Sequence, residues 1–557
     1  MNNKNIFYII CIFLLGLVLF IPFLGTIHLF DWDEINFAEA SREMIITGDY
    51  LTVRINYEPF HEKQPLFFWL QVISMKIFGI NEFAARFPNV IIGILTLVAI
   101  FFIGKDLYDS KFGFLWVLSY IGSFLPNFYF RTGLIDPTFN LFIFLGAYFI
   151  FKFINNFELN SSKRYTDIII AALFVSLATM TKGPVGYLIP ALVWLIYWII
   201  RRKKIKLSLK EFLLFTVISF SLFIIWYGTI LIKNGWDIFF QNIEYQIRLL
   251  TTNDAGFSGP IYYHFLVVLI GCFPASIFAL TSLKKSFIDN AIQNNYRIWT
   301  IVLLATVLVL FSLVQTKIIH YSSLTYLPIT FLSAHFIYYT INEASKFRLW
   351  LMLAFVIIGS LWAILMIAIP IIGYNAEQIA LQSSDSFTQE VLRSNVNWGG
   401  YEYILGLFYL ILLIIATYYF WKMKIKIGFI IVTISTALVL FFYLVFVAPK
   451  IEEYVQGAPI EFLKTLKGKK CYIELLDVPN LKYSHYFYAE KAPDIANKVK
   501  TQKLNESYTL WLLSGDIDLP SYFITKITEV NKYMSKYHDL IVLYTKNGYA
   551  FLMRKSR

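Results

Sequence analysis

Charged side chains are scarce in this sequence, and they first gather in FDWDEINFAEASREMIITGDYLTVRINYEPFHEKQPLFFWL, residues 30–70. Asp33 and Glu34 are adjacent near the start of this stretch, and Glu62 and Lys63 are adjacent near its end. A carboxylate can take a proton from an attacking group, and a lysine can hold an anion. Because strongly apolar segments flank the stretch, we predict that this chemistry takes place at the surface of a membrane.

The elements that position these residues begin with a predicted helix from about Glu34 to Ile46. Asp31 or Asp33 can cap its N-terminus, and Gly48 follows its end. An apolar stripe would be formed by Ile35, Ala38, Met44 and Ile45. The other face carries Glu39, Arg42 and Glu43, which can pair at helical spacing. A helix of this kind lies on a membrane rather than crossing it.

Composition identifies a protein with many membrane spans. Of 557 residues, 58% are hydrophobic, 19% aromatic and 15% charged, and the mean hydropathy is +0.61. This excludes a soluble enzyme with one large core. The net charge of +12 does not indicate nucleic acid as a partner, because the basic residues stand in short loops between apolar runs. Three isolated cysteines, Cys11, Cys272 and Cys471, provide neither a disulfide framework nor a cysteine metal site.

The apolar runs predict about thirteen spans, with the N-terminus and Lys4 on the cytoplasmic side. The spans are 6–24, 87–107, 112–130, 138–154, 168–180, 185–200, 212–232, 261–283, 299–314, 322–341, 349–372, 403–421 and 427–447. The apolar segment 66–80 carries Lys76 and is shorter than the ~20 residues that a span needs, so we interpret it as an interfacial or re-entrant helix. Counting it as a span would place the basic loop RRKKIK outside, against the positive-inside rule.

Two domains are expected. Residues 1–448 form a polytopic α-helical membrane domain, in which 30–86 are the first outer loop with its interfacial helices. Residues 449–557 form a soluble α/β or α+β domain on the outer, periplasmic face. Strands are predicted in CYIELL and YTLWLL, a hairpin in DLIVLYTKNGYAFLMRK with its turn at Asn547 and Gly548, and helices near 460–466 and 524–536.

With this topology, the polar residues that looked scattered fall at one face of the membrane. They are Asp33, Glu34, Glu62, Lys63, Arg131, Asp136, Lys182, Arg248, Lys317, His320 and Tyr321. Each has a plain structural explanation: Lys182 and Lys317 can snorkel, Asp136 can cap the span after it, and His320 can be a packing residue. Together they suit a lipid-phosphate substrate, because cations can stabilise the charge on a leaving phosphate while a carboxylate takes a proton. No cofactor is predicted; His and carboxylate spacing indicates no metal site, and a divalent cation is left open.

The stretch DEINFAEASREMIITGDYLTVRINYEPFHEKQPLFFWL resembles the first outer loop of membrane glycosyltransferases with the GT-C fold. The similarity is to the branch that contains bacterial aminoarabinose transferase and relatives of dolichyl-phosphate-mannose protein mannosyltransferase. It continues through NEFAARFPN, the segment 131–136, LATMTKGPVGYLIP, EYQIRL and LVQTKIIHYSSLTYLP, and so covers about residues 30–330.

The resemblance implies roles for particular residues. Asp33 matches the acidic residue assigned as catalytic base or acceptor-orienting group, Glu34 is its companion, and Asp136 matches the second acid. Cations that hold a polyprenyl phosphate are matched by Lys63 and Arg248, and Lys317 with Tyr321 falls in a later motif near the same lipid. Further site candidates are Glu62, Arg131, Lys182 and His320. The sequence departs from the family at Gln64, where proline is common, and at Tyr245, where some relatives have histidine.

The expected function is therefore an inverting glycosyltransferase of a bacterial inner membrane. Its donor would be an undecaprenyl-phosphate sugar, and its acceptor lipid A, another glycan or a protein. One alternative is a transporter or flippase of a lipid-linked sugar, which would need ionisable residues at mid-membrane and interrupted helices. Only His264 and His335 stand inside predicted spans in that way. A structural membrane protein is the other alternative, and it leaves the clustering at the outer face unexplained.

Overall fold

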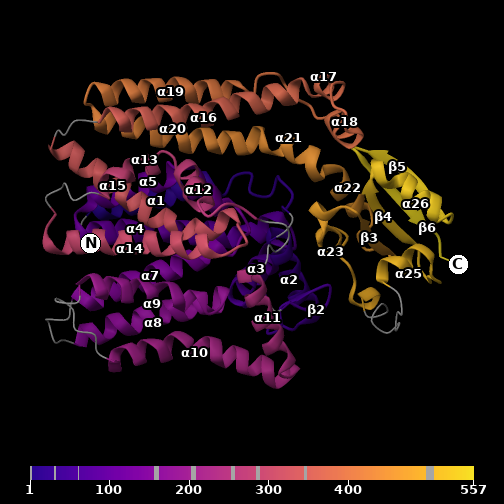
Figure 1. Cartoon of the computed structure of the whole chain (residues 1–557), viewed down its shortest axis with the longest axis horizontal. Coiled ribbons are helices and arrows are strands. Elements are labelled where there is room, and N and C mark those ends of the chain that lie inside the picture. The colour runs from indigo at the N-terminus through magenta and orange to yellow at the C-terminus, as the bar shows by residue number, and fades with distance from the viewer. Residues whose placement is uncertain are drawn as a thin grey trace.

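The computed structural model describes residues 3–30, 33–60, 62–155, 162–201, 209–251, 258–283, 289–343, 348–496 and 507–556. Long helices make up the chain as far as α20 (Ile425–Phe446), and a small sheet with short helices makes up most of the rest. The long helices lie side by side along the long axis of Figure 1, and the sheet lies beyond one end of them. The predicted division into a helical part and a C-terminal mixed part is therefore visible in the fold.

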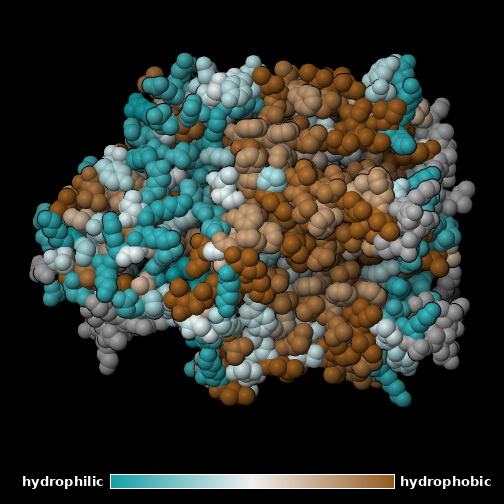
Figure 2. All heavy atoms as spheres, turned by 180° about the vertical axis from the view of Figure 1, so that it is seen from behind, coloured by the Kyte–Doolittle hydropathy of each residue, from teal (hydrophilic) through white to brown (hydrophobic). Residues whose placement is uncertain are grey.

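On the face seen in Figure 2, a broad apolar band covers the helical part, with hydrophilic side chains toward both ends of the helices. Within the described residues, eight helices are long and apolar enough to cross a membrane. They are α4 (Glu82–Leu107), α7 (Asp136–Asn155), α8 (Ser162–Lys182), α10 (Leu209–Asn234), α14 (Ala291–Leu313), α16 (Leu349–Tyr374), α19 (Ile404–Trp421) and α20. A ninth span results if the bent pair α12 (Tyr263–Gly271) and α13 (Ala275–Ser282) is counted as one.

The other four predicted spans also coincide with helices, but these helices do not meet the same test of length and hydropathy. They are α1 (Asn3–Phe20), α5 (Ser110–Ile121) with the short α6 (Phe124–Phe128), α9 (Val185–Arg201) and α15 (Tyr326–Glu343). The many-span architecture is confirmed, and the count of thirteen stays a prediction.

The first outer loop contains two helices and a small hairpin. Helix α2 (Asp33–Thr47) has nearly the predicted bounds, and Gly48 ends it with φ 69°, its N–H donating to the carbonyl of Met44 at 3.1 Å. Helix α3 (Leu66–Phe78) has 13 residues, too few to cross a bilayer. Strands β1 (Arg54–Ile55) and β2 (Glu58–Pro59) turn through Asn56 and Tyr57, and the predicted cap Asp31 lies outside the described residues.

Helix α2 is enclosed by protein, and its place at the membrane surface stays a prediction. Its charged face is buried: the exposed fractions of Glu39, Arg42 and Glu43 are 0%, 2% and 0%. The predicted pairing on that face is confirmed, because Arg42 donates to both oxygens of Glu39 at 2.7 and 2.8 Å. Arg42 also donates to the carbonyl of Lys491 in the C-terminal domain at 3.1 Å. Helix α2 is amphipathic, as predicted, but the C-terminal domain packs against its polar face.

The C-terminal sheet has the order β3-β4-β6-β5. Strand β3 (Tyr472–Leu476) is parallel to β4 (Ser521–Lys526), and β6 (Tyr549–Arg554) is antiparallel to both β4 and β5 (Leu540–Lys546). The predicted hairpin is confirmed. Its turn residues Asn547 and Gly548 have φ 52° and 78°, as a two-residue turn of this hand requires.

Two predictions in this domain are wrong. The run YTLWLL forms α25 (Tyr508–Ser514) rather than a strand, with the Ser507 hydroxyl capping the N–H of Leu510 at 3.3 Å. The predicted helix 524–536 is a helix only in its last part, α26 (Val530–Lys536), because residues 524–526 belong to β4. Short apolar runs of this length fit a buried strand or a buried helix equally well.

One hydrophobic cluster joins the C-terminal domain to the first outer loop. Leu29, Ile35 and Ala38 pack with residues of the C-terminal helices and strands, among them Leu463, Tyr488 and Phe551. On the other side of α2, Phe37, Ala40 and Met44 pack against α3. Since α2 is held on both sides, its first residue, Asp33, has a fixed place at the end of the bundle.

Candidate active site at the outer end of the bundle

Three segments that are far apart in the sequence meet at one end of the bundle. Asp33 begins α2, Asp136 begins α7, and His320 belongs to the short helix η4 (Ile319–Thr325) that precedes α15. The Nε2 atom of His320 lies 3.1 Å from Oδ2 of Asp33 and 3.8 Å from Oδ2 of Asp136. The two predicted acidic residues are therefore brought together, with an imidazole between them.

Lys182, the last residue of α8, adds a cation to this group. Its Nζ lies 2.7 Å from Oδ1 of Asp136 and sits 5.1 Å from the ring centroid of Tyr321. Asp136 is 3% exposed, and its Oδ2 has no hydrogen-bond partner within the described part of the chain. A buried carboxylate needs such a counter-charge, and Lys182 supplies it to Asp136.

The charges around Asp33 favour its ionised form. Burial acts to raise its pKa, but the hydrogen bond and charge of His320, with the charges of Lys63 and Lys182, lower the pKa to about 2. For Lys63, burial acts to lower the pKa, and the nearby acids, first Glu62 and then Asp33, raise it above 10.5. A carboxylate and an ammonium therefore coexist at this site at neutral pH.

Glu34 serves a different purpose from its neighbour. It forms a two-point ion pair with Arg86 of α4, at 2.8 Å from Nε to Oε1 and 2.9 Å from Nη2 to Oε2. Its oxygens also accept from the backbone N–H groups of Phe30 and Gly133. Burial opposes ionisation, but these contacts hold the pKa of Glu34 below its usual value. The pair ties the start of α2 to α4 and to the turn before α7.

Arg86 was not singled out from the sequence, although it stands in the segment NEFAARFPN that carries the family resemblance. Its remaining N–H groups donate to the carbonyls of Leu24, Ile27 and His28. The signal that identifies it is physical: a carboxylate as deeply buried as Glu34 requires a cation.

Two of the predicted cations point at backbone carbonyls. Arg131 donates to Leu19 and Pro22 at 3.0 and 2.8 Å, and Lys317 donates to Phe311, Ser312 and Val314. Both are nearly buried, with exposed fractions of 8% and 4%. In this arrangement, each fixes the end of a helix beside the site.

The other candidates are distributed around the site. Tyr321 lies next to His320, and the two ring centroids are 5.4 Å apart. Glu62 stands beside Lys63 in the segment before α3 and contributes to its raised pKa. Arg248 is exposed on α11 (Asp237–Thr251), which contacts α10.

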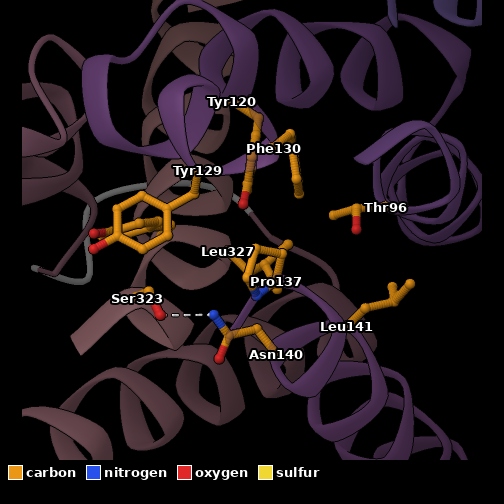
Figure 3. A pocket seen from close by; sticks show the side chains of 10 residues that line it. Thr96, Tyr120, Tyr129, Phe130, Pro137, Asn140, Leu141, Ser323 and Leu327 are labelled. Carbon is orange, nitrogen blue, oxygen red and sulfur yellow. Dashed lines mark hydrogen bonds between the residues drawn. The ribbon is translucent and has the colours of Figure 1, made fainter. Parts of the chain in front are cut away.

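A small pocket adjoins the start of α7, where Pro137 and Asn140 follow Asp136 and line it. Asn140, one turn after Asp136 on α7, donates to the hydroxyl of Ser323 at 2.8 Å, and Figure 3 shows this bond crossing one side of the pocket. The lining residues are Thr96, Tyr120, Tyr129, Phe130, Pro137, Asn140, Leu141, Ser323, Tyr326 and Leu327. Hydroxyl and amide groups therefore extend the polar site into the bundle.

No group of three or more His, Cys, Asp or Glu side chains is arranged to hold a metal ion in the part of the chain that the structure describes. Asp33, Asp136 and His320 are instead joined to each other and to Lys182.

Comparison with known proteins finds a matching family and several relatives. Residues 62–226 match the family described as dolichyl-phosphate-mannose-protein mannosyltransferase. An Aquifex aeolicus protein described as uncharacterized is 29% identical over 323 residues, which cover 57% of this chain and 70% of that protein. Undecaprenyl phosphate-alpha-4-amino-4-deoxy-L-arabinose arabinosyl transferase 1 of Proteus mirabilis is 26% identical over 328 residues. That match covers 58% of this chain and 57% of the transferase, so the chain spans little more than half of that relative's length.

The fold has a match along its whole length. The crystal structure of ArnT from Cupriavidus metallidurans bound to undecaprenyl phosphate is similar with a TM-score of 0.70 and 16% identity, and 98% of each chain is covered. The chain therefore has the GT-C fold of this transferase, and its sequence is similar to the aminoarabinose transferases and to the mannosyltransferase family described above.

Proposed function

We propose that this glycosyltransferase moves a sugar from a polyprenyl phosphate, such as undecaprenyl phosphate, to an envelope acceptor such as lipid A, with inversion at the anomeric carbon. The observation that carries the proposal is the convergence of Asp33, Asp136 and His320, with Lys63 in electrostatic contact with both acids. The named Proteus relative and the undecaprenyl phosphate bound to the Cupriavidus protein support the choice of donor.

The residues at the site divide the reaction between them. Lys63 holds the donor phosphate and stabilises the charge that grows on it as the bond to the sugar breaks. A phosphate leaves without protonation, so no separate acid is needed. Asp33 acts on the acceptor: it takes the proton of an attacking hydroxyl, or it orients an acceptor that is already ionised. Asp136, held by Lys182, is the second acid at the site.

We assign the site and the C-terminal domain to the periplasmic face of an inner membrane. Basic residues gather at the helix ends away from Asp33: Lys105 and Lys111 flank the turn from α4 to α5, and Arg164 and Arg201 stand at the corresponding ends of α8 and α9. Such residues mark the cytoplasmic side of membrane proteins. The N-terminus of α1 is then cytoplasmic.

Incubation of the purified protein in lipid vesicles with radiolabelled undecaprenyl-phosphate sugar tests the proposal. We expect the label to leave the polyprenyl phosphate, by transfer or by slow hydrolysis. Movement of intact donor across the vesicle membrane without cleavage of the sugar–phosphate bond would instead identify a transporter. A donor that is neither cleaved nor moved, across several labelled sugars, would contradict the proposed donor class.

A further inference from the structure

The irregular segment 28–30, which leads from α1 into α2, obtains hydrogen bonds from the C-terminal domain. Leu29, at its centre, is fully buried, and a buried N–H or carbonyl group needs a partner. The N–H of Leu29 donates to the hydroxyl of Tyr488 at 2.7 Å, and its carbonyl accepts from the side-chain amide of Gln456 at 3.2 Å. Two side chains from the far end of the chain therefore bind both backbone groups of this residue.

The structure around Tyr488 and Gln456 holds these two side chains in place. Tyr488 is the last residue of α23 (Ser484–Tyr488), and Gln456 belongs to the short helix η5 (Glu453–Gly457), which runs into α22 (Ala458–Thr465). Their exposed fractions are 4% and 3%. Figure 1 shows α22 and α23 on the side of the sheet that faces the long helices. Because closely packed side chains have few alternative rotamers, both form a rigid support for Leu29.

The preceding residue, His28, is held by the same domain. Its Nδ1 lies 2.9 Å from Oε1 of Glu452, and its Nε2 lies 2.9 Å from Nζ of Lys464. A lysine ammonium can only donate, so Nε2 accepts this bond and Nδ1 carries the proton of the ring toward Glu452. The carbonyl of His28 accepts from Nη2 of Arg86 at 3.0 Å. The backbone and the side chain of His28 are therefore both held.

This segment leads directly into the first turn of α2. The N–H of Phe30 donates to Oε2 of Glu34 at 2.8 Å, and the N–H of Ile35 donates to the carbonyl of Phe30 at 3.2 Å. Leu29 stands four residues before Asp33, the first residue of α2. A shift of the Leu29 backbone would therefore move the turn that carries Asp33.

We propose that Tyr488 and Gln456 are positioning residues for sugar transfer: by binding both backbone groups of Leu29, they determine the place of the first turn of α2 and, with it, the rate of the chemical step. This inference rests on the proposed function and gives the C-terminal domain a part in catalysis. Neither side chain needs to touch a substrate, because both act through Leu29. A domain that only stabilised the protein or bound the acceptor would leave the rate at saturating substrate unchanged.

Removal of the Tyr488 hydroxyl tests this role. Tyr488→Phe keeps the ring in the hydrophobic cluster with Leu29 and Leu463 but removes the acceptor of the Leu29 N–H. Because a misplacement of about 1 Å can slow a reaction about 100-fold, we expect kcat to fall by about tenfold or more. KM for the donor should change little, since the predicted phosphate-binding residues are unaltered. Initial rates are measured with labelled undecaprenyl-phosphate sugar and a saturating amount of envelope membranes from a strain without the protein.

Tyr472 provides a matched control. It is also a fully buried tyrosine of the C-terminal domain, and its hydroxyl donates to Asp518 of the same domain at 2.7 Å. Tyr472→Phe therefore removes a buried hydrogen bond of the same kind without touching the segment before α2. We expect both variants to lower the temperature of unfolding and Tyr488→Phe alone to lower kcat. An equal fall of kcat in the two variants would show that lost stability explains the effect, and it would overturn the inference.

Gln456→Met tests the other bond to Leu29. It keeps a side chain of similar length and removes the amide that donates to the Leu29 carbonyl. We expect a lower kcat here too, and in the double variant with Tyr488→Phe a loss smaller than the product of the two separate losses, since both act through one residue. Losses that multiply fully would contradict the shared role of Leu29.

The outcomes separate the inference from the proposed function. Wild-type kcat in folded Tyr488→Phe and Gln456→Met proteins overturns the inference while the proposed function stands. If Tyr488→Phe does not fold, Gln456→Met decides: a lowered kcat supports the positioning role, and an unchanged kcat overturns it. A wild-type protein that never releases label from the donor contradicts the proposed function itself.

Discussion

Glu34 and Arg86 form a buried two-point ion pair at 2.8 and 2.9 Å, directly beside Asp33. Two adjacent acids in the sequence are thus directed differently: Glu34 points into the protein toward a permanent partner, and Asp33 points toward His320 and the surface of the site. The pair fixes the first turn of α2, and with it the position of Asp33.

Glu34→Gln should therefore act on stability. Breaking a buried pair leaves Arg86 without its counter-charge, which typically costs about 3–5 kcal/mol. We expect a large fall in the unfolding temperature of the detergent-solubilised protein. Asp33→Asn should leave that temperature nearly unchanged. If the two variants lowered it equally, the division of roles between the two acids would be wrong.

Lys182→Met should abolish transfer, because it leaves Asp136 buried with Oδ1 unpaired beside His320. Lys182→Arg keeps a positive charge and should retain a measurable fraction of activity. Initial rates with saturating donor are the measurement. Lys76 is a suitable control, since it lies on α3 over the ring of Tyr50, away from the acids, and Lys76→Met should be close to wild type.

Substitution of Lys63 should chiefly weaken use of the donor. With Lys63→Met, the phosphate loses its nearest cation, and we expect KM for the polyprenyl-phosphate sugar to rise by tenfold or more. Arg248→Met on the exposed helix α11 should act in the same direction if that helix approaches the lipid during the reaction. A donor KM that stays constant in both variants would exclude a phosphate-binding role for these two cations.

Glu43 predicts a dependence of stability on pH. Burial and the nearby Glu39 raise its pKa to about 9. The folded protein therefore keeps a proton that the unfolded chain loses near pH 4.5. Its contribution to stability is full below pH 4.5 and declines as the pH rises toward 9. Glu43→Gln should raise the unfolding temperature at pH 8.5 and have little effect near pH 4.5. A variant less stable than wild type at pH 8.5 would contradict this protonation state.

Much of the fold follows from the sequence because a bilayer leaves few solutions. Apolar runs of about 20 residues must be helices, and each predicted span coincides with a helix or, at 112–130 and 261–283, with two consecutive helices. The hairpin at Asn547 and Gly548 was equally determined, since few residues accept positive φ at both positions of such a turn. By contrast, packing within the C-terminal domain determines that α25 is a helix and β4 a strand. A run of about six apolar residues does not by itself distinguish these two structures.

The sequence predicted which residues lie at the site, but it did not predict how they are arranged. Outer-face clustering selected Asp33, Asp136, Lys182 and His320, and the structure joins all four. The position of a cation at the outer face does not reveal its partner. The clustering therefore could not show that Arg131 and Lys317 contact backbone carbonyls at helix ends rather than a ligand. Nor could the sequence show that the polar face of α2 would be buried, since the carbonyl that Arg42 contacts belongs to Lys491, far along the chain.

The account is tested most directly by release of polyprenyl phosphate from labelled undecaprenyl-phosphate sugar, with wild-type protein and with Asp33→Asn that still binds the lipid. We predict that the wild type releases it in the presence of acceptor and that Asp33→Asn lowers the rate by a thousandfold or more. Full-rate release by the folded Asp33→Asn protein would contradict the claim that this acid, held between α2 and His320, carries the transfer.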